Sequence, residues 1–192
     1  MQVKITFTEP LLGTLSGNKN IAKEFILSKG QKSDEEEALE KQPEVELEKS
    51  CTIFATDENS RPFLWDYQIK GFFKDAAGML NRAIPKEHQL KAYKKIIDGL
   101  IFTKPRKMFL NLSGELGWLE RPLRAQTTQG ERIALARSQT APIGTNIEFE
   151  INCLDSKLEK SVLLWLDYGQ LRGLGQWRNA SFGRFTFEII QN

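Results

Sequence analysis

Residues 171–190 read LRGLGQWRNASFGRFTFEII and join a glycine-bracketed loop to a segment of alternating character. In that segment Phe185, Phe187 and Ile189 fall on one side and polar residues on the other, which is typical of a half-buried strand. Such a strand fixes the preceding loop at the end or edge of a sheet. We therefore expect the chain to close with a loop that a core strand holds in place.

The loop combines glycines with cationic and aromatic side chains. Glycine admits positive φ and close backbone approach to a ligand, guanidinium groups pair with phosphate, and an indole can stack on a base. The residues concerned are Arg172, Gly173, Gly175, Trp177, Arg178, Gly183 and Arg184. Alternatively, the same arginines stack on the indole or pair with carboxylates inside the protein.

Length and composition predict one domain. The chain has 192 residues, 40% of them hydrophobic, which is enough for an ordinary core. It contains no apolar run long enough to span a membrane, and its first residues resemble a strand more than a signal peptide. Two cysteines without metal-ligand spacing predict neither a disulfide framework nor a metal site. We expect a cytoplasmic protein without a cofactor.

The net charge of +2 conceals an uneven distribution. Residues 34–48 hold eight acids and one lysine, a net charge of −7, so the rest of the chain carries +9. We predict a single domain over residues 1–192 with an acidic, mobile insertion at about residues 30–50. A basic body with an acidic segment is common in nucleic-acid-binding proteins, although such a segment can also serve solubility alone.

Hydrophobic periodicity predicts the remaining elements. Strands are expected at 2–8, 51–55, 63–65, 101–103, 107–112, 118–127, 131–140, 146–154 and 185–190. Helices are expected at 21–28, 34–42, 66–82, 86–98 and 156–168, with Asp66 as a cap. Pro122 indicates an edge strand or extended arm, whereas 131–140 and 146–154 are expected to pair as a hairpin.

The order of these elements predicts the fold class. Its outer skeleton is strand, helix, two strands, helix and strand. This order predicts an α+β protein with a ferredoxin-like or RNA-recognition-motif-like antiparallel sheet, helices on one face, and inserted strands.

Three stretches also follow a known pattern: TFTEPLLGTLSGN at 6–18, YQIKGFFK at 67–74, and the glycine loop at 173–183. Together they resemble the RAMP superfamily, the repeat-associated RNA-binding proteins that form the backbones of CRISPR effector complexes. The first resembles the family's strand and glycine turn, and the second its lysine-glycine helix start. Residues 65–68 depart from the usual proline-glycine-serine-serine turn, and the glycine loop is one or two residues longer.

The resemblance implies a RAMP-like fold and RNA contacts from Lys70 and Lys74. A second basic group lies on the strand run and consists of Arg121, Arg124, Arg132 and Arg137. For the arginines of this run, pairing with glutamates across the sheet is the structural alternative; the glutamates are Glu120, Glu131, Glu148 and Glu150. The overall pattern is also similar to small proteins of phages and prophages of Gram-positive bacteria.

These features predict a non-catalytic phage protein that binds single-stranded RNA or DNA through phosphates in the bacterial host cytoplasm. CRISPR effector subunits, or further copies in a filament, are additional candidate partners. One alternative is an anti-CRISPR protein that mimics a CRISPR subunit. Another is a metal-independent RAMP-type endoribonuclease. The latter is disfavoured because the single histidine, His88, lacks a matching motif and residues 13–20 contain no acid.

Overall fold

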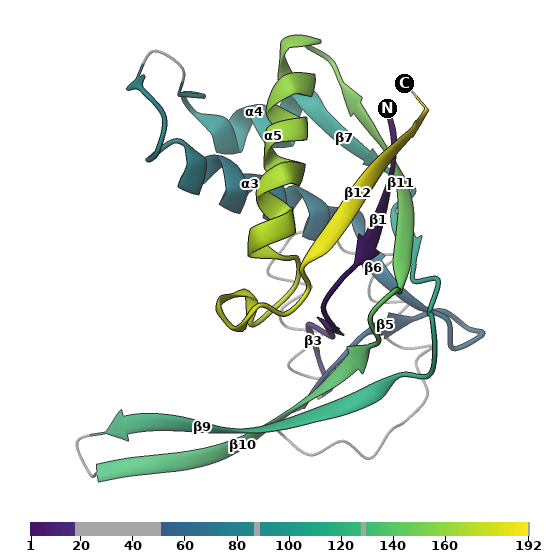
Figure 1. Ribbon diagram of the computed structural model, residues 1–192, viewed down its shortest axis with the longest axis vertical. Helices are drawn as coiled ribbons and strands as arrows, with labels where there is room; N and C mark the ends of the chain where they lie inside the picture. Colours follow the sequence, from purple (N-terminus) through teal and green to yellow (C-terminus); the bar gives the residue numbers. More distant parts are fainter. Residues whose placement is uncertain (18–50, 87–88, 128–129, 192) are drawn as a thin grey trace.

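The computed structural model describes residues 1–17, 51–86, 89–127 and 130–191, and a four-stranded antiparallel sheet lies at its centre (Figure 1). The strand order is β12-β1-β11-β7. The strands are β1 (Gln2–Phe7), β7 (Ile101–Lys104), β11 (Asn146–Cys153) and β12 (Phe185–Gln191). The last strand therefore pairs with the first, and the alternating C-terminal segment is confirmed as a strand of the core sheet.

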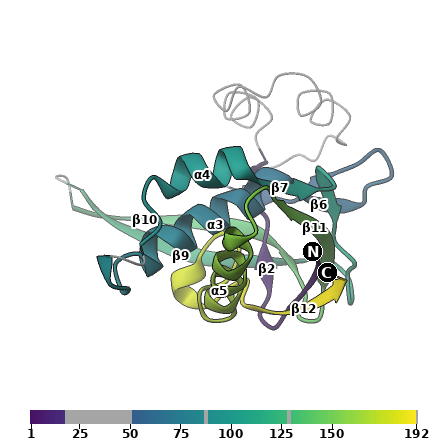
Figure 2. The same ribbon diagram turned by 90° about the horizontal axis from the view of Figure 1, so that it is seen from above.

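Three α-helices of the described residues pack on one face of this sheet. They are α3 (Asp66–Leu80), α4 (Tyr93–Leu100) and α5 (Lys157–Arg172). Seen from above, α3 lies between α4 and α5 (Figure 2). The order along the chain is β1, α3 with α4, β7, β11, α5 and β12, as in a ferredoxin-like domain. The predicted α+β fold is therefore confirmed. None of the described helices is both long and apolar enough to cross a bilayer.

Aromatic rings join the helices to the sheet. The ring of Phe72 on α3 meets Phe185 of β12 edge to face at 5.8 Å, and Phe73 meets Trp165 of α5 at 5.6 Å. Gly169 lets α5 approach this cluster, because a Cβ there would collide with the rings of Phe185 and Phe72. The core thus forms where α3, α5 and β12 converge.

Inserted strands build two smaller sheets beside the central one. One sheet contains β2 (Leu11–Leu12), β3 (Leu15–Ser16), β4 (Cys51–Ile53), β9 (Gly117–Thr127) and β10 (Gly130–Ala141). The other contains β5 (Ala55–Thr56), β6 (Pro62–Trp65) and β8 (Lys107–Phe109). β9 and β10 run away from the body as a long arm (Figure 1). Because β9 pairs only with β10, the predicted edge strand is confirmed.

The predicted hairpin between 131–140 and 146–154 is wrong. β10 pairs with β9, β2 and β4, whereas β11 pairs with β1 and β7. Between them the chain turns from one sheet to the next, and the Gly144 N–H donates to the Phe7 carbonyl at 2.8 Å. The physical reason is burial: Ile147, Phe149 and Ile151 point into the central core, which only a strand beside β1 can reach.

Several predicted boundaries also shift. The helix expected at 86–98 begins at Tyr93, because its N-cap Ala92 adopts a left-handed conformation. Asp66 is the first residue of α3 and not its cap; the N–H of Trp65 is instead satisfied by the Gln68 side chain at 2.7 Å. The last helix continues to Arg172, where Gly173 ends it at positive φ.

Smaller differences complete the comparison. Two short strands, β2 and β3, occupy the turn after β1 that was expected to be a loop. The strand expected at 51–55 is divided into β4 and β5, and the strand expected at 107–112 ends at Phe109. The expected helices at 21–28 and 34–42, the acidic insertion and His88 lie outside the described residues.

Close packing at Gly169 gives a first prediction. We expect Gly169→Ala to lower the free energy of unfolding by about 1–3 kcal/mol, because the added methyl overpacks two phenylalanine rings. Gly99→Ala is the matched control, since a Cβ there meets nothing and alanine favours a helix. Urea denaturation measures both, and equal stability of the two variants would contradict this packing.

Candidate nucleic-acid interface

The glycine loop between α5 and β12 is closed by its own backbone. Gly173, Gly175 and Gly183 have φ values of 82°, 83° and 70°, which favour glycine. Gly173 and Gly183 lie against each other, so a Cβ on either would collide with the opposite backbone. The Leu174 N–H donates to the Gly183 carbonyl at 2.8 Å. The backbone conformation of the loop therefore explains why glycine occupies both positions, and no contact with a ligand is required to explain it.

Two arginines at the ends of this turn share one carboxylate on α3. Arg178 donates to Asp75 Oδ2 at 2.8 Å, and the Nε of Arg172 lies 3.5 Å from the same oxygen. Arg172 also donates to the side chain of Asn179. The three charged side chains are each about a quarter exposed. One carboxylate therefore fixes two guanidinium groups, and the cluster keeps a net positive charge.

The structural alternative for the loop arginines, pairing with a carboxylate inside the protein, is correct for Arg172 and Arg178. Arg172 and Arg178 do pair with a carboxylate, but it comes from a helix and not from the sheet. On the strand run, Arg137 approaches Glu120 at 3.3 Å as expected for a cross-strand pair. This pair is exposed and contributes little to stability.

Trp177 joins the glycine loop to the arm. Its ring is parallel to that of Phe182 at 5.5 Å, and the guanidinium group of Arg121 from β9 lies over it. Burial lowers the pKa of the Arg121 guanidinium from its ordinary value. Two nitrogens of Arg121 and the Nε of Arg184 are buried without a hydrogen-bond partner among the described residues. The guanidinium group of Arg121 is therefore held by the Trp177 ring and adds positive charge beside the loop.

Gln176, which the sequence did not single out, ties the loop to the inserted strands. Its amide donates to Thr52 Oγ1 at 2.6 Å and to the Gly13 carbonyl. The β4 residue Thr52 in turn donates to Ser138 of β10 at 3.0 Å. A single glutamine in a loop carries no periodic signal, so only the folded chain shows this role.

A groove runs from β6 along the start of α3 to the glycine loop. Its larger part has a volume of about 280 Å³ and its smaller part about 180 Å³. Thr14, Leu64, Gln68 and Gly71 line both parts, so the two are continuous. Arg178 and Gly175 line the smaller part. The groove therefore ends at the charged cluster of Asp75 and its arginines.

Lys70 and Lys74 do not join this cluster. The Lys70 ammonium lies 5.0 Å from the Phe102 ring of β7, and Lys74 pairs with Asp98 of α4 at 2.6 Å. Both lysines therefore face the α4 side of α3, whereas Asp75 faces α5 and the glycine loop. Arg124 lies in β9 opposite Ile133, and its side chain is outside the described part of the structure.

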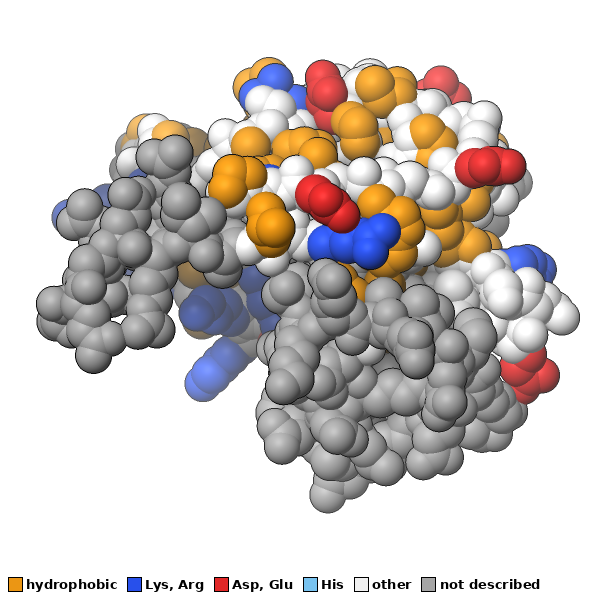
Figure 3. Space-filling view, turned by 90° about the horizontal axis from the view of Figure 1, so that it is seen from below, with side chains coloured by type: hydrophobic (Ala, Val, Ile, Leu, Met, Phe, Trp, Pro, Cys, Tyr) orange, Lys and Arg blue, Asp and Glu red, His pale blue; other side chains and the backbone are white. Residues whose placement is uncertain are grey.

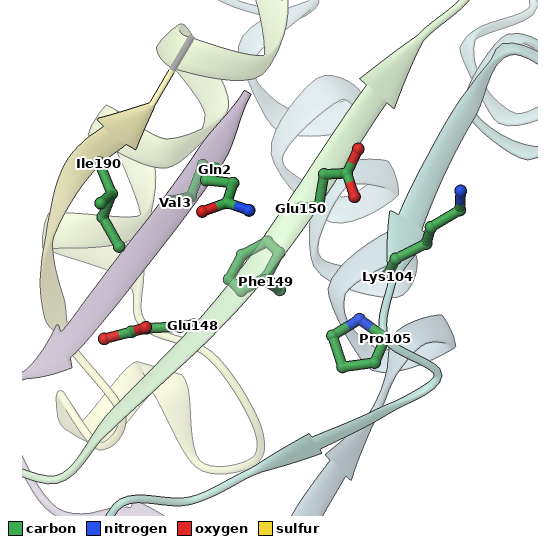
Figure 4. Close-up of a pocket in the computed structure, with 8 residues that line it drawn as sticks. All are labelled: Gln2, Val3, Lys104, Pro105, Glu148, Phe149, Glu150 and Ile190. Carbon is green, nitrogen blue, oxygen red and sulfur yellow. The ribbon is translucent and has the colours of Figure 1, made fainter.

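The open face of the central sheet is acidic where it is hollowed. A cavity of about 490 Å³ is lined by Gln2, Lys104, Glu148, Glu150 and Ile190, among others (Figure 4). Proteins of the RNA-recognition-motif type stack bases on aromatic rings of this face. The outward side chains of β1 and β11 carry both signs of charge, because Lys4 lies 3.8 Å from the carboxylate of Glu148. Carboxylates at this position repel phosphate.

The surface seen from below shows a mixed distribution of charge. Basic side chains stand in separate groups there, next to both acidic and hydrophobic ones (Figure 3). A continuous basic stripe is not seen on the described part of this face.

The shared carboxylate gives a second prediction. We expect Asp75→Asn to lower the free energy of unfolding by about 1 kcal/mol, because two partly buried guanidinium groups lose their counter-charge. Asp98→Asn, which frees Lys74 at a more exposed site, is the matched control with a smaller effect. Chemical denaturation of both variants tests this, and an unchanged Asp75→Asn variant would rule out that role.

Comparisons with known proteins concern the fold. No family model and no curated protein matches the sequence. Among solved structures, a chain of "Cryo-EM structure of the Type III-B Cmr-beta bound to cognate target RNA" superposes with a TM-score of 0.59 at 12% identity. The alignment covers 99% of this chain and 58% of that chain. This protein therefore has an α+β fold similar to part of a chain in an RNA-bound CRISPR effector complex.

Proposed function

We propose that this protein binds single-stranded RNA, without cutting it, in the groove between α3 and the glycine loop. One observation carries the proposal: cationic groups outnumber carboxylates around that loop. Arg172 and Arg178 share the single carboxylate of Asp75. Arg121, whose guanidinium lies over the Trp177 ring, and Arg184, which follows Gly183, add two further positive charges at the loop. Phosphate oxygens supply acceptors of the required charge and geometry.

The geometry favours a single strand over a duplex. The groove has the size of a small-molecule site and narrows toward Arg178. A duplex presents its phosphates on a broad, regular surface, which suits extended basic faces. A single strand can instead lay one nucleotide at a time into a groove of this width.

The fold likeness supports RNA as the ligand. The similar solved structure is described as bound to cognate target RNA. At 12% identity that likeness concerns the fold. The charges of this chain at the glycine loop are therefore the main support for RNA as the ligand. The open face of the sheet lacks a comparable excess of positive charge, because its lysines Lys4 and Lys104 stand beside Glu148 and Glu150.

Binding without cleavage is part of the proposal. Among the described residues, those that line the groove include no histidine, aspartate or glutamate, the usual general bases. The described residues also contain no group of three potential metal ligands. Incubation of labelled RNA with the protein, with and without Mg²⁺, should leave the strand intact. Cleavage that disappears on His88→Ala would favour the endoribonuclease alternative.

A second candidate is interaction with a CRISPR effector complex. The observation that favours it is the alignment of almost the whole chain with part of a chain from such a complex. A protein of this shape can take the place of a subunit. Pull-down from a bacterium with an active Type III system, after ribonuclease treatment, would recover effector subunits on this hypothesis and none on the first.

The third prediction concerns the salt dependence of RNA binding. We expect Arg178→Ala/Arg184→Ala to weaken binding and to flatten the plot of log affinity against log salt by roughly 0.7 for each lost phosphate contact. Fluorescence anisotropy with labelled single-stranded RNA at several salt concentrations measures both effects.

Lys4→Ala/Lys104→Ala is the matched control for that measurement. It removes the same charge from the open face of the sheet, so its slope should stay at the wild-type value. Equal loss of affinity in both double variants would mean that net charge alone, and not this groove, attracts the strand.

A further inference from the structure

We propose that the wide end of the groove is a pocket for one unstacked nucleobase, whose nucleotide places its phosphate at Arg178. The inference rests on the proposed function and adds a contact that reads a base in an otherwise phosphate-binding site. It assigns a role to the aromatic residues around the start of α3, which the arginine cluster leaves unexplained.

Aromatic rings line the wide end. Trp65 and Tyr67 lie nearly parallel, with ring centres 6.3 Å apart and an interplanar angle of 14°. Phe63 meets Trp65 edge to face at 4.9 Å. All three residues line the 280 Å³ part of the groove, together with the apolar Phe54. Phe54, Phe63 and Trp65 are nearly fully buried and support the half-buried Tyr67, which is the ring that a base can reach and stack on.

Cations lie against the same rings. The Lys107 ammonium is 5.4 Å from the centre of Phe63 and 5.7 Å from that of Trp65. The guanidinium carbon of Arg106 is also 5.7 Å from the Trp65 ring. These charges raise the positive potential at the wide end, so a phosphodiester strand that passes the pocket is attracted there too.

Gly71 keeps the middle of the groove open. It lies within α3, where glycine is less favourable than alanine, and a Cβ there would meet nothing within 4 Å. Other helical glycines have packing reasons: Gly78 abuts Tyr93, and Gly169 abuts Phe185. Gly99 is also open, but it stands in the last turn of α4 and does not line the groove. The empty position at Gly71 thus gives a ligand access to the helix backbone.

A polar pair separates the aromatic end from the cation. The Gln68 amide donates to Thr14 Oγ1 at 2.6 Å, while its oxygen accepts the Trp65 N–H. Both side chains line both parts of the groove. Beyond them Arg178 is held by Asp75. Along the groove, the aromatic rings come first, the Thr14 hydroxyl and Gln68 amide follow, and the Arg178 guanidinium comes last. The base, ribose and phosphate of a nucleotide have the same order.

Two strands and two variants test the pocket. The strands are a short mixed-sequence RNA and a strand of the same length made of reduced, base-free ribose phosphates. We expect wild type to bind the base-free strand about tenfold more weakly, the value of one stacked base. Gly71→Leu should fill the groove and remove that difference, with an unchanged or higher Tm because leucine favours helix.

Gly99→Leu is the matched control, since it adds the same side chain at an open helical glycine outside the groove. It should keep the wild-type preference for the strand with bases. Tyr67→Leu removes a stacking ring and serves as a second variant should Gly71→Leu fail to fold; it should also abolish the preference.

The outcomes separate this inference from the proposed function. Equal affinity of wild type for both strands, with a normal salt dependence, overturns the base pocket and leaves phosphate binding standing. A preference that survives both Gly71→Leu and Tyr67→Leu also overturns it. Absence of binding to either strand removes the proposed function and the pocket together.

Discussion

The pairing of the last strand with the first is the constraint on which the rest of this structure depends. Phe7 and Phe185, opposite each other in β1 and β12, are both almost fully buried, and each contributes about 1.5–3 kcal/mol by burial. Their pairing places the residues before β12 beside those after β1. The Gly183 N–H accordingly donates to the Pro10 carbonyl at 2.9 Å. A loop from residues 173–183 thereby comes to lie over the start of α3.

Charge then decides what this arrangement is suited to bind. The loop brings two arginines to one carboxylate, which fixes their side chains and leaves a positive excess. The opposite face of the sheet carries Glu148 and Glu150 beside its cavity. On that face Lys4 pairs with Glu148 and Lys104 lies opposite Glu150, so it offers no comparable excess of positive charge. The groove between α3 and the glycine loop has aromatic rings at one end and a guanidinium group at the other. A nucleotide likewise has an aromatic base at one end and a negatively charged phosphate at the other.

The sequence predicted the features that depend on local pattern. Alternation identified β1 and β12, and hydrophobic periodicity identified the helix α3. Contacts between distant residues could not be predicted, because the Asp75 to Arg178 pair spans 103 positions. Lys70 and Lys74 were grouped with the loop by resemblance, but their side of the helix faces α4. Trp65 is buried in the core and also lines the groove, a double role that no local pattern indicates.

The most direct measurement is crosslinking of bound RNA that contains 4-thiouridine, followed by mass spectrometry of the crosslinked peptides. The proposed site predicts crosslinks in the peptides that carry Tyr67 to Gly71 and Gln176 to Arg178, which face the groove from α3 and the glycine loop. Crosslinks confined to the open face of the sheet, at Gln2, Glu148 or Glu150, would contradict the account, because the strand would then lie on the acidic side of the domain.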